Sequence, residues 1–87
     1  MMLLETVLVA ALSVNTLDTQ TLEQYYWDCD TAYMQQRLSG QDMNTCLTVT
    51  REFILQRFDN DMTKFWDYWA RQRVTEWRQR GYTATGR

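Results

Sequence analysis

The chemistry open to this chain rests on carboxylates, hydroxyls and two cysteines, because none of its 87 residues is a histidine. Histidine is the usual general base and a frequent zinc ligand, so the common nucleophilic triads and most zinc sites are excluded. No glycine-rich phosphate-binding loop is present either. We therefore expect no catalytic residue, no metal site and no cofactor, and the sequence predicts a protein that is not an enzyme.

Two pairs of acidic residues stand two positions apart, Asp28 with Asp30 and Asp59 with Asp61. On one helix, side chains at that spacing point about 200° apart and do not converge on a substrate. Neither pair continues into the glycine and the later glutamate that a calcium-binding loop requires. We interpret these acids as residues of helix faces and helix caps.

The elements that position these residues are predicted to be helices, since the chain has no proline, only three glycines and no clean alternation of apolar and polar residues. A first helix begins near Asp18, Thr19 or Thr21, and a second follows the break around Gly40 with Asp42 as its N-cap. A third runs from about Met62 to Arg80 and stops at Gly81. The apolar faces are expected to be Leu22, Tyr26, Cys29 and Tyr33, then Met43, Leu47, Thr50, Ile54 and Phe58, then Met62, Trp66, Trp69 and Trp77.

These patterns predict an all-α fold, a compact bundle of three to four helices that includes a helical hairpin. The expected organisation is an apolar segment at 1–17, a helical domain at 18–81 and a frayed tail at 82–87. The apolar segment is open to two interpretations, a first helix packed on the others or an uncleaved export signal. It is too short to span a bilayer, which takes about 20 residues.

The two cysteines lie on either side of the predicted turn around Gly40, Cys29 on the first helix and Cys46 at the start of the second. In an antiparallel hairpin these positions come close enough for a disulfide, which would stabilise so small a domain by about 3 kcal/mol. The alternative is a pair of buried free thiols. We favour the disulfide. A redox-active pair is not expected, because the Cys-x-x-Cys spacing is missing.

The third predicted helix is rich in tryptophan and arginine, residue types that are enriched at protein-binding hot spots. Arg73 stands four residues from both Trp69 and Trp77, so its guanidinium is expected between the two indoles. Asp67 with Arg71 and Glu76 with Arg80 have the spacing of helical ion pairs. We expect Trp66 and Trp69 in the core. The candidate contacts with a partner are Trp27, Tyr68, Arg71, Arg73, Trp77, Arg78 and Arg80.

Four short segments resemble small, uncharacterised bacterial exported proteins. They are Trp27-Asp28-Cys29-Asp30, residues 40–46, Phe58-Asp59-Asn60-Asp61 and Trp66-x-x-Trp69, which together span about residues 25–80. The resemblance implies an oxidising compartment and a bridge between Cys29 and Cys46, and it brings no catalytic role. The sequence departs from an export signal at Glu5, where a positive charge is expected.

The charge of the chain is unevenly distributed, since ten of its eleven acidic residues precede Tyr68 and five of its nine basic residues follow it. With a net charge of −2, nucleic acid is not the expected partner. We predict a non-enzymatic helical module, periplasmic or secreted, that binds another protein through its C-terminal helix. The alternative is an accessory subunit of a larger complex, cytoplasmic or peripheral to a membrane, that docks through the apolar N-terminal segment.

Overall fold

The structure, a computed structural model, describes residues 14–83. A short 3₁₀ helix, η1 (Val14–Thr16), precedes three α-helices, α2 (Thr19–Met34), α3 (Gly40–Phe58) and α4 (Met62–Gln79), and residues 14–83 contain no strand. The predicted all-α fold is confirmed. Of the predicted apolar segment at 1–17, residues 1–13 lie outside the described part of the chain, and of the predicted tail at 82–87, so do residues 84–87.

The helices begin at side-chain caps that satisfy backbone N–H groups left free at a helix start. Asp18 accepts a hydrogen bond from the Thr21 N–H at 2.7 Å, which confirms it as one of the expected caps of α2. Ser39 caps α3 through the N–H of Asp42. The prediction of Asp42 as this N-cap is therefore wrong, because the helix already begins three residues earlier.

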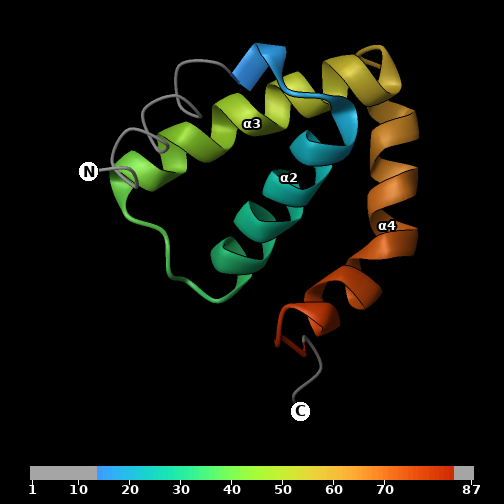
Figure 1. The fold of residues 1–87 in the computed structure, drawn as a ribbon. Coiled ribbons are helices and arrows are strands. Elements are labelled where there is room, and N and C mark those ends of the chain that lie inside the picture. The colour runs from blue at the N-terminus through green and yellow to red at the C-terminus, as the bar shows by residue number, and fades with distance from the viewer. Residues whose placement is uncertain (1–13, 84–87) are drawn as a thin grey trace.

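The connection between α3 and α4 is a tight acidic turn. Asp59 and Asn60 adopt the left-handed conformation, with φ of 55° and 63°. Asparagine and aspartate tolerate this region because their short polar side chains bond locally. Asp61 then caps α4 by accepting from the Lys64 N–H. The turn leaves α4 running beside α2, in the same direction (Figure 1).

An aromatic cluster forms the centre where the three helices meet. The ring of Tyr26 stacks on Phe53 at 5.2 Å and meets Phe65 edge-on at 5.6 Å, and Phe58 lies 5.8 Å from Phe65. Offset and edge-to-face pairs of this kind add to the free energy gained by burial. The buried hydrophobic residues of this core are Val14, Leu22, Tyr26, Trp27, Val49, Phe53, Ile54, Phe58 and Phe65.

The helix faces differ from the predicted ones in four places. Tyr33 of α2 is 58% exposed, although it was expected on the apolar face of that helix. Leu47 of α3 is 48% exposed, and Met62 and Trp66 of α4 are 46% and 52% exposed, although all three were expected to face the core. Phe65, one residue before Trp66, is 2% exposed and provides the main core contact of α4. A helix rotated to bury Phe65 turns the adjacent Trp66 outward, because neighbouring residues on a helix lie about 100° apart.

Cys29 and Cys46 are paired in a disulfide that joins α2 to α3, with their Cα atoms 5.7 Å apart. No free cysteine remains among the described residues. This bridge closes the hairpin of α2 and α3, the two helices that pack together most extensively. The preferred interpretation of the cysteine pair is confirmed, and a bridge of this kind is typical of proteins in oxidising compartments.

Candidate protein-binding surface

Two of the seven residues expected to contact a partner are buried. Trp27 is 0% exposed and Trp77 is 3% exposed, so neither indole can offer its ring to another protein in this fold. Trp27 belongs to the core cluster and meets Tyr26 edge-on at 5.0 Å. Trp77 is covered by Tyr82, whose ring lies 5.6 Å away. Tyr82 was expected to belong to a frayed tail, and it packs instead against the end of α4.

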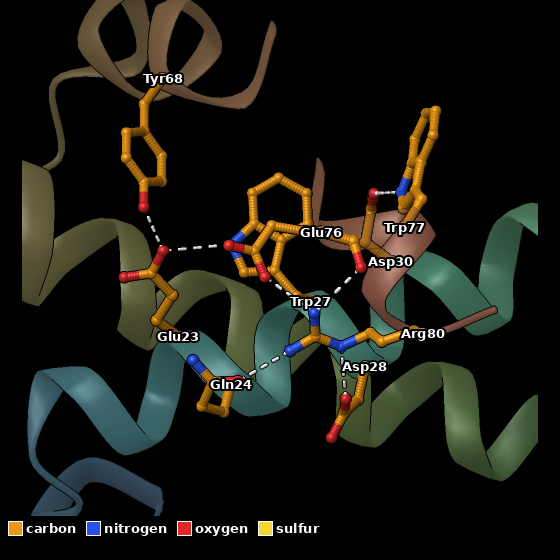
Figure 2. Close-up of polar contacts among 9 residues, drawn as sticks. All are labelled: Glu23, Gln24, Trp27, Asp28, Asp30, Tyr68, Glu76, Trp77 and Arg80. Carbon is orange, nitrogen blue, oxygen red and sulfur yellow. Dashed lines mark hydrogen bonds and ion pairs between the residues drawn. The ribbon is translucent and has the colours of Figure 1, made fainter. Parts of the chain in front are cut away.

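The indole N–H groups of α4 are held by one carboxylate of α2. Asp30 accepts from Nε1 of Trp77 at 2.8 Å and from Nε1 of Trp69 at 3.3 Å. Figure 2 shows the first of these bonds. Burial raises the pKa of Tyr26, and the nearby charge of Asp30 raises it further. Asp30 therefore ties the C-terminal part of α4 to α2.

A second carboxylate lies two helical turns earlier on α2 and has the same role. Glu23 accepts from Nε1 of Trp27 at 3.2 Å and from the hydroxyl of Tyr68 (Figure 2). Burial, followed by the hydrogen bond to Glu23 and its charge, raises the pKa of Tyr68. Glu23 and Asp30 stand seven residues apart, so they lie on one face of α2, and that face receives α4.

Arg80 completes the attachment of α4. Its guanidinium bonds Asp28 at 2.7 Å, Glu76 at 2.8 Å and the side-chain oxygen of Gln24 at 2.8 Å (Figure 2). Burial alone would lower the pKa of Arg80, and the bonds to the two carboxylates outweigh it, so the pKa lies above its ordinary value. The predicted ion pair with Glu76 is confirmed, and Arg80 links α4 to α2 instead of facing outward.

Arg73 lies where the sequence predicts it. Its guanidinium carbon is 4.7 Å from the ring centre of Trp69 and 5.8 Å from that of Trp77. The two indoles hold a positive charge at the edge of the attached face, since the negative faces of their rings attract it. The expected arrangement of this arginine is confirmed.

Of the remaining candidate contacts, Arg71 and Arg78 lie on the solvent side of α4, and Tyr68 does not. Arg71 pairs with Asp67 at 3.2 Å, and both side chains are largely exposed. Arg78 is exposed in the last turn of the helix. Tyr68 is half-buried between Glu23 and the guanidinium of Arg57, which lies 5.1 Å from its ring centre. Tyr68 thus belongs to the attachment of α4, and only its edge is open.

The outward face of α4 carries an apolar stripe that was not predicted. Its four residues are spaced four apart, a spacing that aligns them along one side of the helix. Trp66 and Val74 are 52% and 47% exposed, Met62 is 46% exposed and Ala70 is exposed. The four extend over about 18 Å at the helical rise of 1.5 Å per residue. We call Met62, Trp66, Ala70 and Val74 the α4 stripe.

The spacing of the α4 stripe is visible in the sequence, but a competing stripe hid it. Met62 and Trp66 also align with Trp69 and Trp77. This alternative stripe contains more aromatic residues than the α4 stripe, so it suggests the core face of the helix. Phe65 is the residue that distinguishes the two, because it has no polar atom and is buried most readily. The edge of the Trp66 ring lies against Trp69 at 5.5 Å, which orients the exposed indole.

Two open depressions lie on the surface of residues 14–83. One lies at the end of the hairpin and is lined by Tyr33, Met34, Gln36, Leu38 and Met43. Another is lined by Arg57, Phe58, Asp59, Lys64, Asp67, Tyr68 and Arg71. Within residues 14–83 no three cysteine, aspartate or glutamate side chains gather closely enough to hold a metal ion. Asp28 and Asp30 bond different partners, as their predicted divergence requires.

None of the helices in the described part of the chain has the length and apolar character that a membrane crossing needs. No family model, curated protein or solved structure matches this chain. The resemblance to small exported proteins therefore stays a prediction. What the geometry offers is a helix fixed on one side by hydrogen bonds and carrying exposed apolar residues on the other.

Proposed function

We propose that this protein is a non-enzymatic, disulfide-linked helical module that binds another protein through the outward face of α4. The contact surface consists of the α4 stripe with Arg71, Arg73 and Arg78 around it. Trp27 and Trp77, expected as contacts, support this surface from within the fold. An oxidising compartment, the periplasm or the outside of a cell, agrees with the pairing of Cys29 and Cys46.

The observation that carries the proposal is the exposure of Trp66. A half-exposed tryptophan between two exposed apolar residues is costly for a small protein to leave in water, and such patches mark contact sites. Tryptophan and arginine also dominate the binding energy of known interfaces. The stripe is held on a rigid helix, so little conformational entropy would be lost on binding.

A cross-linking experiment in the cells that naturally express the protein tests this function. A photoreactive aromatic amino acid, which keeps a large ring at the position, replaces Trp66 in one variant and Thr75 in a matched control. Thr75 is exposed on the same helix and points away from the α4 stripe. We expect a discrete cross-linked protein from position 66 and none from position 75. Equal products at both positions, or none at either, would rule out the α4 stripe as the binding surface.

A further inference from the structure

Two copies of the α4 stripe, laid antiparallel, have complementary shapes. If a second α4 lies antiparallel across the first, with the crossing point at position 68, position 66 faces position 70 and position 62 faces position 74. The large indole of Trp66 then meets the small methyl of Ala70, and the long side chain of Met62 meets the short Val74. Facing helices fill space without voids when large side chains of one pack against small side chains of the other.

The charges along α4 also favour an antiparallel pair. Asp61 and Asp67 outnumber Lys64 in the first half of the helix and its cap, whereas three arginines face Glu76 alone in the second half. An antiparallel pair places each acidic half beside a basic half, and it also opposes the two helix dipoles favourably. A parallel pair would set Trp66 against Trp66 and Arg71 against Arg71.

We infer that the partner of the α4 stripe is a second copy of this chain, docked antiparallel with Trp66 of each copy over Ala70 of the other. This inference rests on the proposed function, because it names the occupant of the same surface. A stripe of about 18 Å buries less than the roughly 800 Å² per partner of a stable interface, so the dimer forms and separates with concentration.

The ion pair of Asp67 with Arg71 gives a specific test of this arrangement. Both side chains are exposed, at 69% and 61%, on one flank of the stripe. In the antiparallel dimer, Asp67 of one copy lies about 3 Å along the axis from Arg71 of the other, a displacement of two residues. These two residues therefore form ion pairs between copies as well as within one.

Charge reversal separates pairs between copies from pairs within a copy. Asp67→Arg alone places arginine against arginine across the interface, and Arg71→Asp alone places aspartate against aspartate. A mixture of the two variants forms a heterodimer with opposite charges, although each chain still lacks its internal pair. Sedimentation velocity and native mass spectrometry over a concentration series measure the three cases. We expect each variant alone to dimerise about tenfold more weakly than the wild type, and the mixture to recover.

Trp66→Ala with Thr75→Ala as its control tests the stripe itself. Trp66→Ala is expected to abolish the dimer, while Thr75→Ala leaves it unchanged, and circular dichroism of both establishes that they are folded. A wild-type chain that stays monomeric at millimolar concentration, or a mixture no stronger than its components, overturns the inference. If this chain is monomeric and position 66 cross-links to a different protein, the proposed function stands and only the inferred dimer is contradicted. If the chain is monomeric and position 66 gives no cross-link, both the proposed function and the inferred dimer are contradicted.

Discussion

Replacing Asp30 by alanine tests whether hydrogen bonds to indole groups hold α4 on α2. The variant leaves Nε1 of Trp77 and Nε1 of Trp69, now 2.8 Å and 3.3 Å from the carboxylate, without their acceptor. Each hydrogen bond to a charged group contributes about 1.5–3 kcal/mol. Because Asp30 is half-buried, the lower end of this range applies, and we expect a loss of about 3 kcal/mol in the free energy of unfolding.

The assay is urea unfolding followed by far-ultraviolet circular dichroism and tryptophan fluorescence, with Asp28→Ala as the matched control. Asp28 lies two residues away on the same helix, and its side chain is 62% exposed in its ion pair with Arg80. Because Asp28 lies mostly in water and the largely buried Arg80 keeps Glu76 and Gln24 as partners, losing this ion pair costs less than about 1 kcal/mol. Both substitutions raise helix propensity alike, so the difference between them reports the bonds that Asp30 accepts, which come from the two indoles and from the hydroxyl of Tyr26.

Asp30→Asn keeps an oxygen acceptor without its charge and is expected to fall between the two alanine variants, at a loss of about 1–2 kcal/mol. Trp77→Phe removes one donor and keeps a ring in place. The loss from Asp30→Ala should therefore be smaller in a Trp77→Phe background, by the free energy that couples the two groups. Equal losses from Asp30→Ala and Asp28→Ala would show that packing alone holds α4, and the reasoning on the carboxylate would fail.

Removing the disulfide with the double variant Cys29→Ser, Cys46→Ser should lower the free energy of unfolding by about 3 kcal/mol, since the bridge closes a loop of 17 residues. An unchanged urea midpoint would contradict this. The raised pKa of Tyr68 predicts stability that is full below about pH 10 and falls as the pH rises further, because the unfolded chain gives up the phenolic proton first. Tyr68→Phe should reduce this alkaline fall in a pH series of unfolding curves, and the part that remains is the contribution of Tyr26, whose pKa is also raised by burial. The buried hydroxyl of Thr31 has no hydrogen-bond partner within residues 14–83, so Thr31→Val should stabilise the fold by about 1 kcal/mol in the same urea assay.

The number of helices and their ends are largely readable from the sequence, because the signals are local. Asp18 and Asp61 each cap a helix through a neighbour three residues away, and the turn at Asp59-Asn60 forms from residues in direct succession. The cysteine pair was predictable as soon as a hairpin was assumed, since the turn fixes which positions face each other. The start of α3 was misplaced only because Ser39 and Asp42 are both good N-caps.

The candidate surface was predicted less well, because which face of a helix is buried depends on contacts between distant residues. Trp27 was placed outside although its indole could be buried at little cost, since Glu23 stands four residues earlier on the same helix to accept its N–H. That acceptor was a readable signal. Asp30 accepts from indoles 39 and 47 residues away, and no local pattern announces such bonds.

The same bonds explain why α4 has a free apolar face. Carboxylates at positions 23 and 30 of α2 fix the aromatic hydrogen-bond donors of α4 on one side, and Arg80 fixes its end. A helix attached by directed hydrogen bonds and by two deeply buried aromatic residues, Phe65 and Trp77, does not need the exposed apolar residues of its outward face for folding. Trp66 is therefore free to serve binding, and a substitution there should change association with a partner far more than it changes the stability of the fold.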